Sequence, residues 1–296
     1  MFLVKPSYQI LAASQKYHEF PYNYEKSNNL IEVAGRTCYK SEDKITEDSA
    51  KKFIEMLKNK GHNAMIEHSW QLRYYDTINL PYYKFLNFMQ VRFIGTCVAG
   101  NQRAFDDWNF DMKDEYESIS QEDEMNLIYK EKRWDMLAAT VKFICDRGVS
   151  HELVRHRPPA FAQESTRYCN YSKDKFQNQI TFIIPPWIKD YKEGCYTQQE
   201  YDHQFTAIKG EETRWLRSLL HAEHDYNTLI DYEWKPEQAR SILPNALKTE
   251  IVVSTDLQEW KHIFKLRTAP AAHPQMRELM IPLQEEFKKL YPEVFE

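Results

Sequence analysis

An α+β fold with a mostly antiparallel sheet and long flanking helices is the class that the sequence predicts. Segments with helical spacing of apolar residues alternate with short runs rich in β-branched and aromatic residues. These segments do not follow the regular strand-helix-strand order that builds a parallel sheet. The chain has 296 residues, of which 42% are hydrophobic, so it can bury a full core in one large domain or two small ones.

The first half of the chain predicts two helices and three strands. Apolar residues recur at helical spacing over residues 30–39 and 49–60, and Gly61 follows where a helix C-cap would lie. The residues from 106 to 124 are crowded with carboxylates, which indicates a solvated excursion or surface helix rather than a functional acidic site. Three runs rich in β-branched and aromatic side chains predict strands: residues 70–75, 90–98 and 140–145.

The second half predicts two strands and four helices. Asp256 is the expected N-cap of a helix over residues 257–266, because its side chain can accept a hydrogen bond from a backbone amide of the first turn. The predicted strands are residues 179–186, which end at two prolines, and residues 249–254. The predicted helices are residues 197–232, 236–243, 257–266 and 274–290.

Composition and charge exclude several classes of protein. The net charge of −5 argues against general binding of nucleic-acid polymers, which normally needs a basic face. No run approaches the roughly 18 to 20 apolar residues of a membrane span, and Lys5 stands where a signal peptide would need apolar residues. We therefore expect a cytosolic protein without a membrane segment.

The cysteine and histidine spacings indicate no metal or disulfide site. The five cysteines are widely spaced and form no C-x-x-C pair, so we interpret them as reduced thiols. His221 and His224 lie three residues apart on a predicted helix but lack a placed carboxylate base and a third ligand. The cysteines are Cys38, Cys97, Cys145, Cys169 and Cys195.

Standard nucleotide-binding motifs are also absent. Only seven glycines occur, and none forms the G-x-G-x-x-G pattern of a dinucleotide fold or the G-x-x-x-x-G-K-[ST] pattern of a P-loop. A nucleotide bound to this chain would therefore be held by side chains.

Residues 154–168 concentrate cations in this acidic chain. Guanidinium groups are planar, permanently charged and bidentate toward phosphate, so three of them near a hydroxyl group indicate a pocket for a phosphorylated small molecule. The alternative is a solvated basic helix end. Two features argue against this alternative: a pair of prolines would end the helix, and apolar residues would line a pocket. The three arginines, with the histidine and the serine among them, are Arg155, His156, Arg157, Ser165 and Arg167.

Ser165 has two chemical interpretations. As a nucleophile it would need a base such as His156 in contact, and that base would need an orienting group. As a hydrogen-bond donor to phosphate it needs neither, and we favour this role.

Arg155-His156-Arg157, seven intervening residues, Ser165 and Arg167-Tyr168 together resemble the signature of the flavin-dependent thymidylate synthases. The similar segments span roughly residues 30 to 290, with about 71–138 as an insertion relative to the shortest members, so we expect one catalytic domain over residues 1–296. Four further segments resemble blocks of that family in the same order: Gly61-His62 with Glu67-His68, Cys145 to Glu152, Ala239-Arg240 to Pro244, and Trp260 through His262 to Arg267.

The resemblance implies the family's fold and the reductive methylation of deoxyuridine monophosphate (dUMP) to thymidylate (dTMP). Methylenetetrahydrofolate would give the carbon, FAD would relay the hydride and NADPH would reduce the flavin. FAD held in grooves between the subunits of a homotetramer would explain the missing dinucleotide-fold glycines. The expected ligands are thus small molecules, with no nucleic-acid polymer, membrane or metal ion.

The family pattern also implies site residues. Arg267 is the expected catalytic residue, because a fixed guanidinium beside the uracil ring stabilises negative charge on the ring and raises electron density at C5. The implied flavin contacts are Arg155, His156, Arg157, Gln163, Asp256 and His262. The implied nucleotide contacts are Glu152, Arg155, Glu164, Ser165, Thr166, Arg167, Arg240 and Arg267.

Some positions depart from the family pattern. Gln163 replaces a common glutamate, and Glu164 beside it can supply similar hydrogen bonding. Cys38 and Ala64 stand where many members have a hydroxyl residue that contacts FAD, and Asp256 and His262 stand where asparagines are frequent.

Two other functions compete with this interpretation. A nucleotide- or flavin-binding sensor would keep the arginine pocket without catalysis, and the departures from the family pattern motivate that alternative. A flavin-free thymidylate synthase would need a cysteine nucleophile in a Pro-Cys-His context, which none of the five cysteines has.

Overall fold

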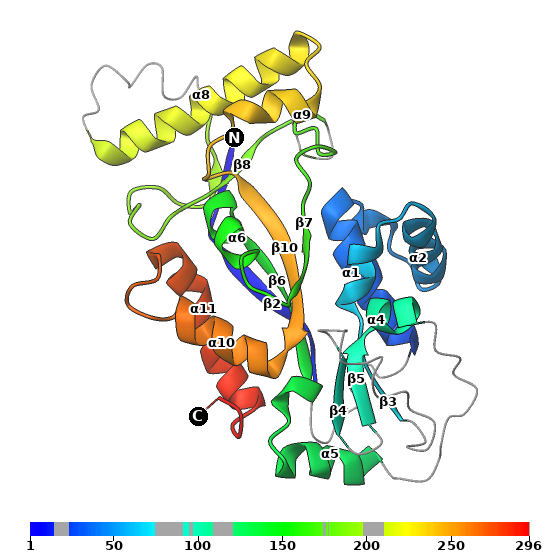
Figure 1. Cartoon of the computed structure of the whole chain (residues 1–296). Coiled ribbons are helices and arrows are strands. Elements are labelled where there is room, and N and C mark those ends of the chain that lie inside the picture. Colours follow the sequence, from blue (N-terminus) through cyan, green and yellow to red (C-terminus); the bar gives the residue numbers. More distant parts are fainter. Residues whose placement is uncertain are drawn as a thin grey trace.

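The computed structural model has a four-stranded antiparallel sheet at its centre, in the order β2-β6-β10-β7 (Figure 1). The described residues are 1–14, 24–74, 91–94, 97–108, 121–173, 176, 178–197 and 210–295. The strands are β2 (Ser7–Ala13), β6 (Ala138–Asp146), β7 (Ala160–Gln163) and β10 (Lys248–Asp256). Strands β6 and β10 pair along their whole length, so they form the rigid middle of the fold.

The sheet is covered on both faces because its strands alternate between two sets of side chains. Phe143 and Val253 belong to the core formed with α10 (Leu257–Arg267) and α11 (Pro274–Leu290). Val252, on the opposite face, packs with residues of α1 (Tyr24–Tyr39) and β7. This alternation places charged residues of β10 under α1, where they build part of the site described below.

Aromatic packing fixes α10 and α11 on their face of the sheet. Trp260 is fully buried and its indole Nε1 donates to the Ala139 carbonyl at 3.0 Å. The Trp260 ring lies 5.6 Å from Phe264 and 5.3 Å from Phe287, centroid to centroid. The C-terminal end of α10, which carries Arg267, is therefore held in place by a packed core.

The helix α2 (Ser49–Asn59) ends in a Schellman motif. Gly61 has a φ of 70°, and its amide donates to Lys58 while the amide of His62 donates to Leu57 at 2.9 Å. The predicted C-cap glycine is thus confirmed, and the turn leads into the 3₁₀ helix η2 (Asn63–His68).

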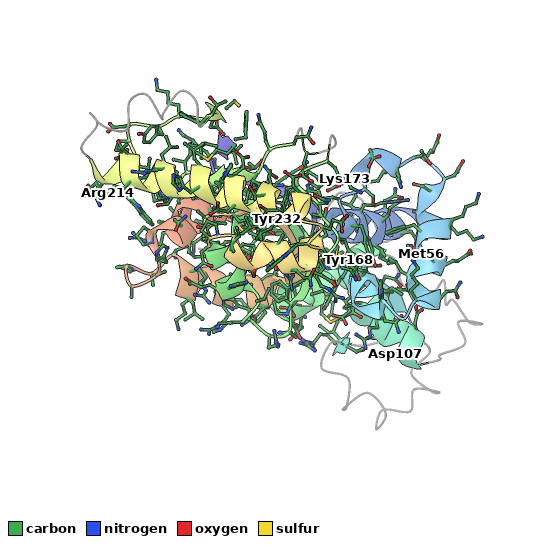
Figure 2. All side chains as sticks on the ribbon, turned by 90° about the horizontal axis from the view of Figure 1, so that it is seen from above. Met56, Asp107, Tyr168, Lys173, Arg214 and Tyr232 are labelled. Atoms are coloured by element: carbon green, nitrogen blue, oxygen red, sulfur yellow. The ribbon has the colours of Figure 1, made fainter. Side chains whose placement is uncertain are left out.

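A second sheet lies under the longest described helix. Its order is β8-β1-β9, with β1 (Phe2–Val4) parallel to β8 (Thr181–Ile183) and antiparallel to β9 (Gly194–Cys195). Leu3 and Phe182 share a core with α8 (Glu211–Asp231), which crosses the top of the molecule from the side of Arg214 to Tyr232 (Figure 2). The chain continues into the short helices α9 (Pro236–Ala239) and η5 (Arg240–Ile242).

A third sheet corrects one expectation. The strand predicted over residues 90–98 is wrong, because β4 (Val91–Ile94) and β5 (Cys97–Asn101) pair antiparallel in its place. A glycine at position 95 interrupts the apolar run, and glycine is a turn signal. The sheet order is β3-β5-β4, where β3 is Trp70–Tyr74. The elements that follow along the chain are α4 (Gln102–Trp108), α5 (Gln121–Lys130) and η3 (Trp134–Met136).

Most other expectations are confirmed, including the α+β class and the helices that begin at Ser49, Leu257 and Pro274. The predicted start of a helix at residue 197 is wrong, because that residue lies outside any helix. The helix α8 begins at Glu211, and residues 198–209 lie outside the described residues. The helix predicted over 236–243 tightens into 3₁₀ geometry after one turn. Most of the acidic stretch, residues 109–120, also lies outside the description. Within the described residues, no helix is long and apolar enough to cross a membrane.

Candidate active site

The short helix α6 (Arg147–Leu153) presents the first site residues. Its N-cap Asp146 accepts from the amide of Val149 at 2.7 Å, and the helix ends before the loop that carries the arginine-rich motif. Glu152 therefore lies in the last turn, and His156 lies in the loop, where it is buried.

Arg267 at the end of α10 joins these two residues. Its Nη1 donates to the Glu152 carboxylate at 2.7 Å, its Nη2 donates to the Glu152 carbonyl at 2.9 Å, and its Nε donates to His156 Nε2 at 2.9 Å. Three of the five guanidinium donors are thus used on two residues that precede Arg267 by more than a hundred positions. The structure brings together three residues that the sequence assigned to one site.

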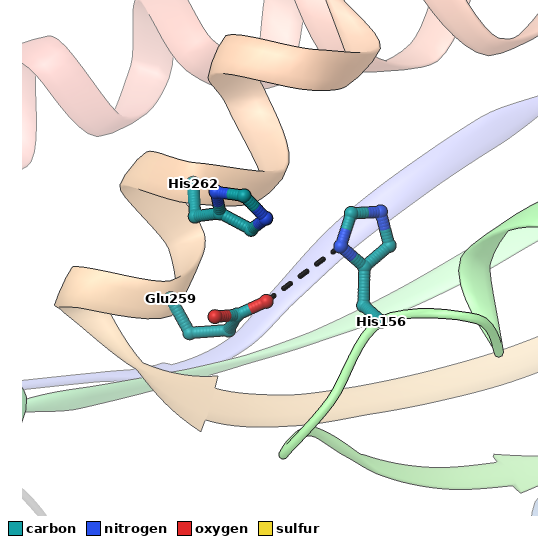
Figure 3. Close-up of side chains that lie close together, drawn as sticks. All are labelled: His156, Glu259 and His262. Carbon is teal, nitrogen blue, oxygen red and sulfur yellow. Dashed lines mark ion pairs between the residues drawn. The ribbon is translucent and has the colours of Figure 1, made fainter.

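The bond from Arg267 determines how His156 carries its proton. Because Nε2 accepts a hydrogen bond, a neutral imidazole must hold its proton on Nδ1. That Nδ1 lies 3.6 Å from Glu259 Oε1, and the ring meets the ring of His262 edge-on at 6.0 Å between centroids (Figure 3). Glu259 was not predicted, although its three-residue spacing from His262 puts both on one face of α10.

His156, Glu259 and His262 also have the composition of a metal site, since one ligand atom from each lies within 4.8 Å of the others. Coordination by His156 Nδ1 would move the proton to Nε2, where it would face the Nε–H donor of Arg267. The guanidinium charge would also repel a cation. The arrangement therefore favours the bond from Arg267 to His156 over a bound metal ion.

Asp256 performs the predicted capping of α10. Its buried carboxylate accepts from the amide of Glu259 at 2.7 Å and lies 3.8 Å from the guanidinium of Arg92. Burial raises the pKa of Asp256 to about 6, although the Glu259 amide and the charge of Arg92 act in the opposite direction. The carboxylate thus has a structural role, and its contact with a flavin stays a prediction.

We expect Asp256→Asn to stabilise the protein at alkaline pH. The folded pKa is raised, so the stabilising contribution of Asp256 is present below its unfolded pKa near 3.8 and is lost as the pH rises through about 6. Asparagine keeps the cap without the buried charge, which predicts a gain of about 2 kcal/mol at pH 8 and none near pH 4. Urea unfolding at both pH values measures this difference in the free energy of unfolding, and Asp231→Asn, at an exposed position, is the control. An equal effect at both pH values would contradict the prediction.

Residues 165–167 form a second group around Arg240. Arg240 Nη1 donates to the hydroxyl of the buried Thr166 at 2.8 Å, and the Arg167 amide donates to Ser165 Oγ at 3.3 Å. Within the described part of the chain, no imidazole contacts Ser165, so the structure gives the nucleophile interpretation no base. The side chain of Arg167 is 58% exposed, and its Nε lies 4.0 Å from the Glu237 carboxylate.

The side chain of Glu164 contacts interior residues and not the group around Arg240. Its side chain is buried, accepts from Tyr171 at 3.3 Å and pairs with Lys248 at 3.0 Å. Lys248 also pairs with Glu250 at 2.5 Å, which in turn pairs with Lys142 at 2.6 Å and contacts Lys40. A cavity of about 590 Å³ adjoins this group of lysines and glutamates.

The remaining predicted flavin residues fall into two sets. Gln163 is tied into the fold, because its Nε2 donates to Ser150 Oγ at 2.7 Å and to Thr249 Oγ1 at 3.2 Å. Arg155 and Arg157 are exposed, and Arg157 Nη1 donates to the Val154 carbonyl at 2.7 Å. Only the second set presents charge to a ligand.

The segment of residues 61–68 supports the sheet beneath these groups. His68 is fully buried and burial lowers its pKa to about 4, so it is neutral at physiological pH. Its Nδ1 lies 2.8 Å from Ser254 Oγ on β10, and Glu67 pairs with Arg103 of α4. Cys38 reaches the motif through its carbonyl, which accepts from the Ser165 amide at 3.0 Å. Ala64 lies in η2.

Comparison with known proteins extends the sequence resemblance. The chain matches the family described as thymidylate synthase complementing protein over residues 115–293, more than half of its length. It is 32% identical over 145 residues to a flavin-dependent thymidylate synthase of Pyrococcus furiosus, covering 49% of this chain and 52% of that protein. For the enzyme of Geobacter sulfurreducens the identity is 30% over 150 residues, covering 50% and 55%. The chain spans about half the length of the curated relatives it matches.

A solved structure, thymidylate synthase X from Helicobacter pylori with FAD and dUMP, is 18% identical, with 62% of this chain and 85% of that chain covered and a TM-score of 0.43. A likeness at that score supports no further conclusion. The family match over residues 115–293 includes the arginine-rich motif and both later blocks. The chain therefore belongs to the thymidylate synthase complementing protein family, that of the flavin-dependent thymidylate synthases.

Proposed function

We propose that this chain catalyses the reductive methylation of dUMP to dTMP, with methylenetetrahydrofolate as carbon donor, FAD as hydride relay and NADPH as reductant. The observation that carries the proposal is the junction of Arg267 with Glu152 and His156. It joins the start of the arginine-rich motif to the last block of the family pattern. A fixed guanidinium at that junction suits an anionic ring held next to a cofactor.

The residues present fit the ligands of this reaction. Arg155 and Arg157 are exposed cations two residues apart, which suits the pyrophosphate of FAD, and His262 is an exposed polar side chain in the middle of α10. Arg167 and Arg240, with the hydroxyl of Ser165, suit the phosphate of dUMP. Bound FAD would supply the hydride chemistry, and the protein would hold and orient the two rings.

Arg267 would act on the nucleotide ring. Its Nη groups lie against Glu152, so the guanidinium plane is fixed before the substrate binds. A preorganised cation stabilises charge that develops on the ring without reorientation during the reaction. Glu152 would hold this cation, and His156 would accept its Nε–H.

A homotetramer with shared sites, one catalytic domain with an insertion at about 71–138, and a cytosolic location complete the proposal. The homotetramer with shared sites is supported by the exposed side chains of Arg155, Arg157 and Arg240, which leave donors for a partner subunit or a ligand. The free thiols of the described Cys38, Cys145, Cys169 and Cys195 support a reducing compartment.

Turnover tests the proposal directly. The purified protein, supplied with FAD, NADPH, methylenetetrahydrofolate and dUMP, should form dTMP and oxidise NADPH only when dUMP is present. Binding of FAD and dUMP without any dTMP would instead favour the sensor. A colourless protein that forms dTMP without NADPH would overturn the flavin route.

We expect Ser165→Ala to keep measurable activity. If Ser165 only donates a hydrogen bond to phosphate, its loss weakens transition-state binding by about 1 to 3 kcal/mol. Steady-state kinetics with varied dUMP would show the loss mainly in kcat/KM. A covalent serine adduct trapped with substrate, or complete loss of turnover in a folded variant, would contradict this role.

A further inference from the structure

Glu259 has a buried oxygen without a hydrogen-bond partner. Its Oε1 is inaccessible to solvent and accepts no hydrogen bond from any described residue. The side chain is 13% exposed, so its charge is largely removed from water. Buried carboxylate oxygens without donors are rare and costly, so this atom calls for a partner.

The nearest assigned donor is His156. Its Nδ1 lies 3.6 Å from Glu259 Oε1 (Figure 3), which is longer than a hydrogen bond. The bond from Arg267 to Nε2 leaves Nδ1 as the only ring nitrogen of a neutral His156 that can donate. Contacts of this kind are often long without ligands and tighten in the complex. A closure of about half an ångström would complete the bond.

We infer that Glu259 is a positioning residue that acts on Arg267 through His156. It accepts the Nδ1–H of His156 and so keeps Nε2 unprotonated, as the acceptor for Arg267 Nε–H. The importance of this arrangement for turnover rests on the proposed function. The arrangement itself is a property of the folded chain.

The consequence concerns the third bond of Arg267. Two of its bonds go to Glu152, whose side chain is 36% exposed, whereas the third goes to the buried His156. If the proton of His156 moves to Nε2, two N–H groups face each other and that bond is lost. Arg267 would then be held only from the solvent side, and its Nε would no longer be fixed.

The tautomer of His156 can be measured without turnover. Nitrogen-15 spectra of histidine-labelled full-length protein, at mildly alkaline pH where imidazoles are neutral, distinguish protonated from unprotonated ring nitrogens. The His156→Gln variant lacks the ring signals of His156, so comparison with the parent spectrum assigns those signals. We expect protonated Nδ1 in the parent protein, a shift of the proton toward Nε2 in Glu259→Ala, and the parent pattern in Glu259→Gln, which keeps an acceptor oxygen.

Kinetics give the second readout. We expect about a tenfold loss of kcat in Glu259→Ala with a smaller change in KM for dUMP, because misplacing a functional group by about 1 Å can cost about a hundredfold in rate. Glu259→Gln should recover most of the loss. Glu285→Ala is the matched control, because Glu285 is 57% exposed on α11 and pairs only with Lys288 among the described residues.

Three outcomes would overturn the inference. They are an unchanged tautomer in Glu259→Ala, an unchanged kcat in that variant, and a metal ion retained by the parent protein but lost from both Glu259→Ala and His262→Ala. The last would make the carboxylate a metal ligand. A parent protein without turnover would refute the proposed function alone, since the tautomer shift would still be observed.

Discussion

Replacement of Arg267 by alanine is expected to remove nearly all dTMP formation. The variant loses the only guanidinium that the described structure ties to both Glu152 and His156. Removal of one preorganised group that stabilises developing charge costs about a hundred- to a thousandfold in kcat. Single-turnover formation of dTMP with reduced flavin measures this loss at the chemical step.

Arg267→Lys separates charge from geometry. Lysine keeps one positive charge but cannot make the fork of bonds to Glu152 and His156, so we expect only partial recovery of kcat. Lys265→Ala, at an exposed position two residues earlier on α10, is the control for damage to the helix. Near-normal turnover in Arg267→Ala, with unchanged thermal unfolding, would refute the catalytic role.

The local signals of α10 are visible in the sequence, whereas its partners are not. Asp256 was predicted as the N-cap because capping depends on residues three positions apart, and the structure confirms it. The bond from Arg267 to His156 spans 111 positions and depends on where α6 ends and how its loop turns. Residue spacing holds no information on that distance, so only the family resemblance placed the two residues in one site.

Strand β10 shows a second reason why prediction stops. Residues 249–254 were predicted as a strand from β-branched side chains, and the strand is there. Lys248 and Glu250 lie at its start, and their spacing in sequence does not show what covers them. The structure buries them, because Lys40 just after α1 and Lys142 on β6 both contact Glu250. Burial of this kind depends on helix packing across the sheet.

The buried lysine–glutamate group makes Lys248 important for stability. Burial alone would lower the pKa of Lys248, but the charges of Glu164 and Glu250 raise it above its usual value. Burial would likewise raise the pKa of Glu250, but Lys248, Lys40 and Lys142 hold it well below its usual range. Both shifts indicate that the charged forms are favoured in the folded protein.

Lys248→Met is therefore expected to destabilise the protein by about 3 kcal/mol at pH 7, because it leaves the buried carboxylate of Glu164 without its nearest cation. The depressed pKa of Glu250 gives stability that is present above its unfolded pKa and is lost as the pH falls toward the folded value. The difference between parent and variant should consequently begin to shrink near pH 4, because the unfolded chain takes up protons there while Glu250 of the folded parent still holds its charge. Urea unfolding at pH 7 and pH 4 measures both effects.

A second variant shows whether the loss comes from an unpaired charge. Removing both partners of a buried ion pair costs less than removing one, so Lys248→Met combined with Glu164→Leu should recover most of the stability at pH 7. Lys261→Met, at an exposed position on α10, is the control for loss of a lysine in general. If the double variant is as unstable as Lys248→Met alone, packing of the lysine stem rather than its charge supports β10. That strand leads into α10, which begins after Asp256 and ends at Arg267, so the same packing would also hold the site in place.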